Sequence, residues 1–259
     1  MFYDLSTVTL ILLALAIFFA GFVDAIAGGG GLIQTPALLL SLPNENPVSV
    51  VGTSKTAAFF GTTTAAIKYR KSIKTDTKLL LAMVGPAFIG ACCGALLASH
   101  ISPQSFKSAI FFMMIAIFIY TFIKPDLGKH QVEKHSPRRL AQIGGVAAFV
   151  IGFYDGLIGP GTGTMLMIVL VAVMGFAFVG ASAIAKVVNA TTNLASIIVV
   201  GLKLGIFWKL ALFLGAANLI GGYLGSHVAI KKGSGFIRYF YLIVTALLIM
   251  RLGYSLYLE

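Results

Sequence analysis

The chain has 259 residues, of which 58% are hydrophobic and 10% are charged, whereas about 25% of the residues in a soluble domain are charged. This composition excludes an ordinary soluble protein and favours an all-α, polytopic membrane protein surrounded by the lipid bilayer. The formal net charge is +11, from 19 basic and 8 acidic residues. Because the charges lie in short segments between apolar runs, as in cytoplasmic loops of membrane proteins, we expect no nucleic-acid partner.

The first apolar run, Leu5 to Phe22, approaches the length of about 20 residues that a helix needs to cross a bilayer. Because Met1 to Asp4 carry no positive charge, we expect a retained helix and not a cleaved signal peptide. A glycine-rich break follows at Gly28 to Gly31, and then a short apolar stretch, Leu32 to Leu42. The break therefore interrupts an apolar region and does not end it.

The later apolar segments continue this pattern on both sides of a polar linker. In chain order they are Pro47 to Ile67, Leu79 to Ala98, Ile110 to Ile123, Ile143 to Tyr154, Thr164 to Phe178, Val179 to Val200, Leu210 to Ala229 and Tyr239 to Met250. We predict a first transmembrane repeat at residues 1–123, a cytoplasmic linker at 124–138 and a second transmembrane repeat at 139–259. Each repeat would contain four or five membrane segments.

The two halves match each other at one ungapped offset of 131 residues, which is the separation of Asp24 and Asp155. The offset aligns Gly21-Phe22-Val23-Asp24 with Gly152-Phe153-Tyr154-Asp155, Lys55 with Lys186, and the pair Gly90/Gly94 with Gly221/Gly225. The two aspartates are the acidic residues within apolar segments, and the two lysines are the most deeply placed in such segments. A chance match is a poor explanation for charges in register, so we infer an internal repeat.

The orientation of the halves depends on the two short stretches, Leu32 to Leu42 and Thr164 to Phe178. If they cross the membrane, each half has five spans and the halves are inverted; if they are re-entrant, each half has four spans and the halves are parallel. Leaving aside Lys55 and Lys186, both arrangements place 13 of the 19 basic residues on one side and 4 on the other, so the positive-inside rule does not decide. We favour five spans, because Thr164 to Phe178 is apolar enough to cross if tilted.

Asp24 and Asp155 are candidate proton-coupling groups, because a carboxylate within a membrane segment is costly and by default functional. A structural role is the alternative, since an acid suits the N-terminus of the helix that restarts after the break. Breaks at corresponding positions of two halves point to the central site of a transporter, and their free N–H groups suit an anion. The alternative is that these glycines bind nothing and only allow neighbouring helices to pack closely. The candidate glycines are Gly28, Gly29, Gly30, Gly159 and Gly161.

Lys55 and Lys186 lie about eight residues inside segments of roughly 21 residues, and so about 12 Å deep, too far for the ammonium group to reach the surface easily. They could line one anion site or pair with the two aspartates, and we favour the anion site. Neighbouring hydroxyl and amide groups could bind substrate oxygens or only join helices. The candidates of this kind are Thr53, Ser54 and Asn189, the last of which lies one turn beyond Lys186.

The sequence shows no nucleophile–base arrangement and no metal-ligand spacing. The break at Gly28 to Gly31 also lacks the Gly-Lys-Ser/Thr of a nucleotide-binding loop. We therefore expect no enzymatic activity, no cofactor and no metal site.

Four motifs together resemble a known family. They are Gly21-Phe-Val-Asp-Ala-Ile-Ala-Gly-Gly-Gly-Gly31, Gly52-Thr-Ser-Lys55, Gly152-Phe-Tyr-Asp-Gly156 and Ala185-Lys-Val-Val-Asn-Ala-Thr191. With them the chain, over nearly its whole length, resembles the sulfite exporter TauE/SafE family, also called the toluene-sulfonate uptake permeases. The resemblance implies a probable membrane transporter in the plasma (inner) membrane of a prokaryote. Members of the family are linked to export or uptake of sulfite, sulfonates and related anions. Pro160 and Thr162 replace glycines of the first break, so the two breaks need not act alike.

We therefore predict a secondary transporter, an exporter or permease, that moves a small sulfur-containing or organic anion, such as sulfite or a sulfonate, by alternating access. Because no ATP-binding motif is present, we expect an ion gradient, namely protons, to drive it. The alternatives are a passive channel or a carrier for another small solute, and a non-transporting membrane subunit. The sequence leaves the oligomeric state open, a homo-oligomer included.

Overall fold

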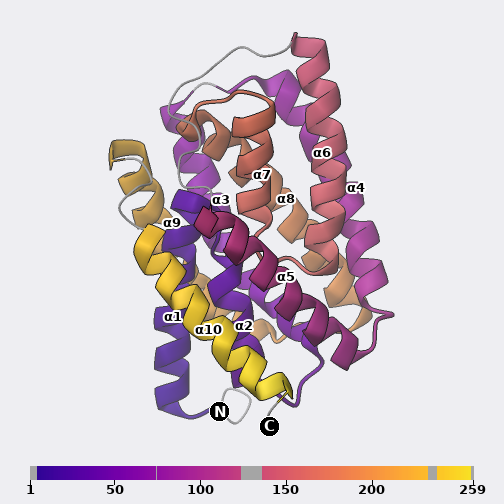
Figure 1. Ribbon diagram of the computed structural model, residues 1–259, viewed down its shortest axis with the longest axis vertical. Helices are drawn as coiled ribbons and strands as arrows, with labels where there is room; N and C mark the ends of the chain where they lie inside the picture. Colours follow the sequence, from indigo (N-terminus) through magenta and orange to yellow (C-terminus); the bar gives the residue numbers. More distant parts are fainter. Residues whose placement is uncertain (1–4, 74, 124–135, 233–237, 258–259) are drawn as a thin grey trace.

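The computed structural model describes residues 5–73, 75–123, 136–232 and 238–257, and these residues form helices and no β-strand (Figure 1). The helices are α1 (Thr7–Ala27), α2 (Gly31–Ser41), α3 (Pro47–Ser72), α4 (Thr77–Ala98), α5 (Pro103–Ile123), α6 (Pro137–Leu157), α7 (Thr162–Ile168), α8 (Phe178–Lys203), α9 (Trp208–Lys232) and α10 (Arg238–Tyr257). A π-helical segment, η1 (Val169–Val173), continues α7. The all-α fold class is confirmed.

Five of these helices, namely α1, α4, α6, α8 and α9, are long and apolar enough to cross a membrane. Their outer faces carry exposed apolar side chains, such as Leu12 and Leu15 of α1 and Val146 of α6, which suit contact with lipid tails. The protein is therefore a polytopic membrane protein, as its composition predicts. The equally long α3 is rich in serine, threonine and glycine, and most of its residues are buried inside the bundle.

The helices of the two halves have the same order and nearly the same spacing. The helices α3 and α8 begin at Pro47 and Phe178 and end at Ser72 and Lys203, a separation of 131 residues at both ends. The two G-x-x-x-G pairs also have matching contacts: those of α4 approach the backbone of Phe149 and Phe153 in α6, and those of α9 approach the backbone of Phe18 and Phe22 in α1. The helices thus follow the offset found in the sequence, while descent from a duplication stays a prediction.

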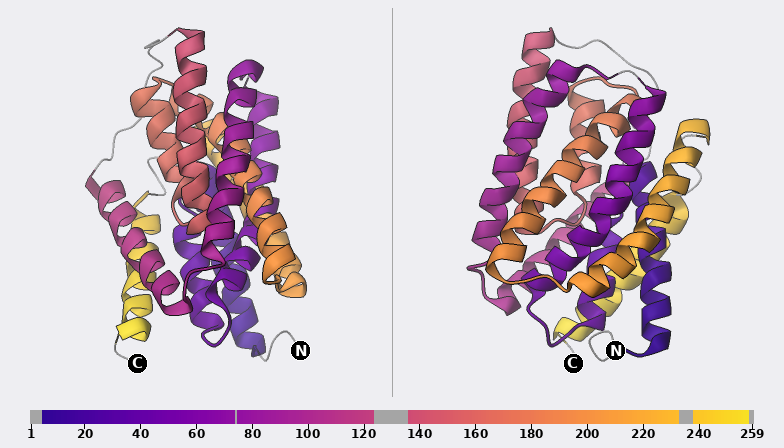
Figure 2. Two further views of the ribbon diagram at one scale, coloured as in Figure 1. Left: turned by 90° about the vertical axis from the view of Figure 1, so that its right-hand side faces the viewer. Right: turned by 180° about the vertical axis from the view of Figure 1, so that it is seen from behind.

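The corresponding helices of the two halves run in opposite directions. Ser49, near the start of α3, donates a hydrogen bond of 3.4 Å to the carbonyl of Leu204, directly after the end of α8. In agreement, α1 begins at one end of the molecule and α6 begins at the other (Figures 1 and 2). The halves are therefore inverted, which is the arrangement that we favoured.

The two short apolar stretches are half-length segments. The helix α2 has 11 residues, and α7 with η1 has 7 and 5 residues, which gives about 16–18 Å of helix against a hydrocarbon core of about 30 Å. Each stretch folds back after the preceding helix, so that α1–α2 and α6–α7 form two hairpins that enter from opposite ends (Figure 2). Whether they cross the membrane stays a prediction. The opposite directions of the two halves require an odd number of crossings in each half, which the five-span arrangement satisfies.

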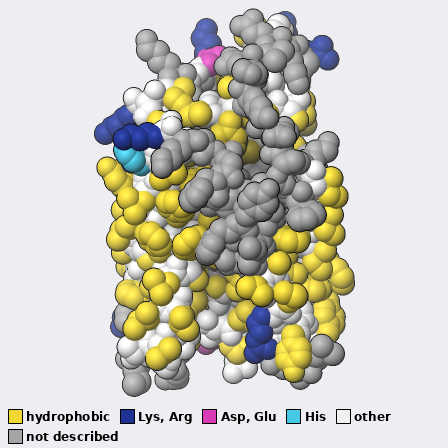
Figure 3. Space-filling view, turned by 60° about the vertical axis from the view of Figure 1, so that its left-hand side comes forward, with side chains coloured by type: hydrophobic (Ala, Val, Ile, Leu, Met, Phe, Trp, Pro, Cys, Tyr) yellow, Lys and Arg dark blue, Asp and Glu magenta, His cyan; other side chains and the backbone are white. Residues whose placement is uncertain are grey.

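Basic residues gather at the end of the molecule where α3 and α9 finish and α4 and α6 begin (Figures 1 and 3). The basic residues of this basic end include Lys68, Arg70, Lys71, Lys78, Arg138, Arg139 and Lys231. The opposite end carries Lys107, Lys203, Lys209 and Arg251. Of the predicted linker at 124–138, the described residues 136–138 lie at the basic end, where α6 already begins at Pro137. Residues 124–135 of that linker, like residues 1–4, lie outside the described residues.

Candidate functional site

The two hairpins turn at the glycine-rich breaks, and these turns meet in the middle of the molecule. Gly28 ends α1 with a φ of +78°, and Gly159 and Gly161 have φ of +94° and +85°, a left-handed backbone that glycine adopts without strain. A Cβ atom on Gly28 would lie 2.4 Å from the carbonyl carbon of Gly163. The glycines therefore allow the backbones of the two breaks to touch.

Each buried lysine pairs with the aspartate of the other half. The Nζ atom of Lys55 lies 2.8 Å from Oδ2 of Asp155, and the Nζ atom of Lys186 lies 2.8 Å from Oδ2 of Asp24. The exposed fractions of the side chains are 7% and 2% in the first pair and 1% and 14% in the second. Because the ions have lost most of their water, each depends on its partner. The lysine–aspartate pairing that the sequence left open is present, and it joins α3 and α8 to the opposite hairpin.

The two aspartates differ in their remaining contacts. The Oδ1 atom of Asp155 accepts a hydrogen bond of 2.6 Å from the hydroxyl of Thr162, the first residue of α7. The Oδ2 atom of Asp24 lies between Lys186 and the more distant hydroxyl of Thr62, at 3.4 Å. No contact to Oδ1 of Asp24 is present in the described part of the chain. Asp24 is therefore the more exposed and the less firmly held of the two carboxylates.

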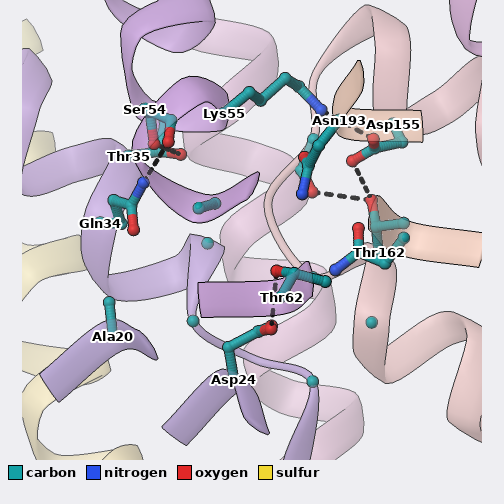
Figure 4. Close-up of a pocket in the computed structure, with 18 of the residues that line it drawn as sticks. Ala20, Asp24, Gln34, Thr35, Ser54, Lys55, Thr62, Asp155, Thr162 and Asn193 are labelled. Carbon is teal, nitrogen blue, oxygen red and sulfur yellow. Dashed lines mark hydrogen bonds and ion pairs between the residues drawn. The ribbon is translucent and has the colours of Figure 1, made fainter. Parts of the chain in front are cut away.

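A small cavity of about 40 Å³ lies between the two breaks (Figure 4). Its polar lining consists of the charged residues Asp24, Lys55 and Asp155, the amides Gln34, Asn189, Asn193 and Asn218, and the hydroxyls Thr35, Ser54, Thr62 and Thr162. Glycines 28, 30, 31, 159, 161 and 163 complete the lining together with a few apolar side chains. This volume holds a few water molecules.

The lining combines an ammonium group, amides and hydroxyls, which are donors that suit the oxygens of an anion. Two lysines and two aspartates leave this region without net charge, so an arriving anion has to compete with a carboxylate for a lysine. Within the described ranges, no three His, Cys, Asp or Glu side chains lie close enough together to hold a metal ion.

Comparison with known proteins identifies the family to which this arrangement belongs. The model of the sulfite exporter TauE/SafE family matches residues 13–252, which is most of the chain. The chain belongs to the TauE/SafE family. Relatives are similar over nearly their full length: the probable membrane transporter protein ORF9 of Sinorhizobium sp is 35% identical, over 96% of this chain and 94% of the relative.

Two further TauE/SafE-like relatives are also named probable membrane transporter proteins. That of Haemophilus influenzae is 33% identical over 92% of both chains, and YfcA of Escherichia coli K12 is 32% identical over 91% of this chain and 86% of the relative. No solved structure matches. The resemblance seen in the repeat motifs is thus confirmed. Since these proteins are transporters and not enzymes, the chain is a multi-pass membrane transporter, and the expectation of no enzymatic activity is confirmed.

Most of the residues predicted from the sequence line the cavity of this TauE/SafE protein. Those that do are Lys55, Ser54, Asn189, Gly28, Gly30, Gly159 and Gly161, together with Asp24 and Asp155. Lys186 lies behind Asp24, to which it is bonded, and Gly29 is not part of the lining. Whether the lining residues bind substrate stays a prediction.

Thr53 has a structural contact outside the cavity. Its hydroxyl donates to the carbonyl of Ser49 at 2.8 Å and accepts from the N–H of Phe207 at 3.1 Å. These bonds join α3 to the turn before α9. The structure therefore places Thr53 next to the cavity-lining Ser54 in sequence but on another face of the helix.

Sequence reasoning missed an amide network on the other side of the cavity. The Nδ2 group of Asn218 donates to Oε1 of Gln34 at 2.7 Å and to the carbonyl of Ile17 at 3.1 Å, and Nε2 of Gln34 donates to the carbonyl of Ser54. Amides inside apolar segments are costly unless bonded, which is a signal that could have found both residues. At the offset of 131 residues, however, they correspond to Met165 and Ala87, so a search for recurring polar residues passes over them.

The hydroxyls of the cavity were missed for a different reason. Thr35, Thr62 and Thr162 lie in apolar helices where threonine commonly returns its hydrogen bond to the preceding turn. Only the assembled structure shows that Thr62 and Thr162 instead lie beside Asp24 and Asp155.

Proposed function

We propose that the protein is a proton-coupled secondary transporter for a small sulfur-containing or organic anion, such as sulfite or a sulfonate, that works by alternating access between its halves. The observation that carries this proposal is the crossed arrangement of Lys55–Asp155 and Lys186–Asp24 where the two broken helices meet. The family description supports the substrate class. Because the named relatives are bacterial, the proposed location is a prokaryotic plasma (inner) membrane, with the basic end in the cytoplasm.

Lys55 is the proposed first ligand of the anion, because its side chain lines the cavity and reaches across it toward Asp155 (Figure 4). Oδ2 of Asp155 lies 2.8 Å from Nζ of Lys55, which is the length of a charge-assisted hydrogen bond. An anion that binds Lys55 therefore has to replace this carboxylate oxygen as the partner of the ammonium group. Amides such as Asn189 and Asn193 can donate to its remaining oxygens.

Charge balance supports coupling of the anion to a proton. The two ion pairs are neutral together, so a bound monoanion adds an uncompensated negative charge to a buried site. Leaving a charge uncompensated in such a site costs several kcal/mol. One proton taken up by a carboxylate restores neutrality, and the proton and the anion then move together in the same direction.

Asp24 is the proposed carrier of the proton. It is 14% exposed, against 2% for Asp155, and its second oxygen has no partner among the residues that the structure describes. Protonated Asp24 would also release Lys186, which could then turn toward the anion as a second positive charge. Asp155 keeps its bond to Thr162 throughout, and its proposed role is to position Lys55.

Proteoliposomes loaded with sulfite or a small sulfonate test the site through counterflow of labelled anion. Lys55→Ala and Lys186→Ala are expected to lower the rate at least tenfold, which corresponds to the loss of about 1.4 kcal/mol or more of anion binding. Lys209→Ala is the matched control, because this exposed lysine lies at the start of α9 outside the site. Rates equal to the unmodified protein in both cavity variants would reject the assignment.

The alternatives make different predictions in the same vesicles. A proton-coupled carrier accumulates the anion when a pH gradient is imposed, and Asp24→Asn should abolish this accumulation while counterflow continues. A passive channel gives a flux that equilibrates the anion whatever the pH gradient. A non-transporting subunit gives no flux of any solute from the purified chain alone.

A further inference from the structure

A cluster of basic side chains lies on the outer surface where α3 and α9 meet at the basic end. Lys68 of α3 donates a hydrogen bond of 3.0 Å to the carbonyl of Tyr223 in α9, and its Nζ atom lies 3.5 Å from the centre of the Tyr223 ring. His227 and Lys231 follow on α9 at steps of four residues, on the same face of the helix. Both are exposed, and Lys68 is half-buried beside them, so the cluster lies at the surface of this seam.

No salt bridge from this cluster to an acidic side chain is present among the described residues, and the ion pairs Lys55–Asp155 and Lys186–Asp24 lie in the central cavity. Lys68 is fixed by Tyr223 and cannot easily move away from Lys231. Two positive charges held near each other raise the local potential and attract an anion. Among the described residues the positive charge of this surface is therefore not balanced by an ion pair.

The inverted halves show that the fold does not require this cluster. At the offset of 131 residues, Lys68, Tyr223, His227 and Lys231 correspond to Val199, Cys92, Leu96 and His100 of the seam between α8 and α4. The α8–α4 seam lies at the opposite end of the molecule, and three of these four corresponding residues, Val199, Cys92 and Leu96, are apolar or small. The basic residues of the α3–α9 seam thus have a reason other than helix packing.

Directly below the cluster, the surface of α9 is apolar. Leu224, one turn before His227, is 42% exposed, and Ile220, two turns before it, is 53% exposed. Figure 3 shows Lys or Arg and His side chains above a band of hydrophobic ones. Tyr223, also exposed at 53%, stands at the boundary, where tyrosine is enriched in membrane proteins. A basic group above an apolar stripe matches the two parts of a lipid.

We propose that this seam binds an anionic phospholipid of the leaflet at the basic end. Its phosphate would accept hydrogen bonds from Lys68 and Lys231, and its acyl chains would lie along Ile220 and Leu224. A lysine near an anionic membrane surface favours binding by about 1 kcal/mol, which is a factor of about five in affinity. The lipid would hold the ends of α3 and α9 together beside the transport path, independently of which anion is transported.

Native mass spectrometry of the detergent-purified chain, titrated with phosphatidylglycerol and with phosphatidylcholine, tests the proposal. Phosphatidylglycerol should bind the unmodified chain more tightly than phosphatidylcholine. Lys231→Gln should weaken the preference about fivefold, and Lys68→Gln with Lys231→Gln by about 25-fold. Lys209→Gln, on the same helix at the opposite end, should keep the full preference.

Three results would overturn the proposal. One is equal binding of the two lipids, and another is an unchanged preference in the double variant. The third is equal saturation of the site by inorganic phosphate at the same concentration, because the site would then bind a soluble anion and not a lipid. Lys231 is exposed and makes no hydrogen bond in the described structure, so the single variant tests the site even if the double variant fails to fold.

Discussion

The two hairpins of the molecule carry equivalent ion pairs but are anchored in different ways. The first, α1–α2, is tied to its surroundings by amides: Asn218 of α9 joins Gln34 of α2 to the backbone of α1, and Gln34 reaches the backbone of α3 at Ser54. The helix α10 also packs on α2. The first hairpin is therefore hydrogen-bonded to α9 and α3 and packed against α10.

The second hairpin, α6–α7, has most of its side-chain hydrogen bonds within itself, while its external polar contacts among the described residues are the ion pair with Lys55 and a bond from Ser182 of α8 to the sulfur of Met167. Thr162 bonds to Asp155, and the hydroxyl of Tyr154 donates to the carbonyl of Pro160. The seven-residue α7 passes into the π-helical η1, a geometry that often marks functional sites. An apolar groove of about 350 Å³, lined in part by Met165 and Val169, lies beside it.

The difference in anchoring suggests that one hairpin moves during transport and the other stays fixed. Alternating access needs at least one part to move relative to the other, and the element with fewer external bonds moves at the lower cost. We therefore expect α7 and η1 to move during transport while α2 stays with α3 and α9. The variants that follow test this comparison, from the largest expected effect to the smallest.

The largest effect should come from breaking one ion pair. Lys55→Met leaves the buried carboxylate of Asp155 without its positive partner, which should lower the free energy of unfolding by about 3–5 kcal/mol. The double variant Lys55→Met with Asp155→Leu should recover most of this loss, because it removes both charges. Thermal unfolding in detergent measures both. A double variant as unstable as the single one would show that the pair is not the cause.

Removing the negative charge from each ion pair in turn compares how firmly the two aspartates are held. The side chain of Asp24 is 14% exposed and that of Asp155 is 2% exposed. Water can therefore reach the carboxylate position beside Lys186 more easily than the one beside Lys55, although Lys186 itself is only 1% exposed. Asp24→Asn should therefore destabilise the protein less than Asp155→Asn. Equal losses would remove the structural reason for assigning the proton to Asp24.

The contact between the two breaks should give the next largest effect. Gly28→Ala forces a side chain into a φ of +78° and places its Cβ 2.4 Å from the backbone of Gly163, which should cost about 2–4 kcal/mol. Gly85→Ala is the control, because no atom lies within 4 Å of a Cβ at that helical position. The control should be neutral or slightly more stable than the unmodified chain. Loss of stability in both would point to a general intolerance of side chains.

Much of the fold could be predicted from the sequence, because apolar segments in a bilayer have to be helical. The hairpins could not, since α2 and α7 are as apolar as true spans and differ only in length, which the positions of the breaks determine. The offset found Asp24, Asp155, Lys55 and Lys186 because they recur. It could not show that each lysine pairs with the opposite half, since pairing within one half has the same composition.

The amide network should have a moderate effect that is confined to the first hairpin. Asn218→Ala leaves Oε1 of Gln34 without its donor, and an unsatisfied buried group of this kind costs about 1–3 kcal/mol. Hydrogen exchange should then become faster in α2 and remain unchanged in α7. Thr162→Val is the matched change in the second hairpin, where faster exchange should be confined to α7. Equal effects of both variants on both hairpins would show that the hairpins are not anchored independently.

The smallest effect concerns Thr53, which stands next to Ser54 in the sequence but has no place in the cavity. Thr53→Val keeps the shape of the side chain and removes the acceptor of the Phe207 N–H, so stability should fall by about 1 kcal/mol while the affinity for the anion is unchanged. Ser54→Ala should show the reverse, with weaker anion binding and little loss of stability, because this residue lines the cavity. The two adjacent positions thus separate the role of α3 in joining the halves from its role in the site. If Thr53→Val weakens anion binding as much as Ser54→Ala does, the cavity of the binding-competent form extends beyond the present lining, toward the turn before α9.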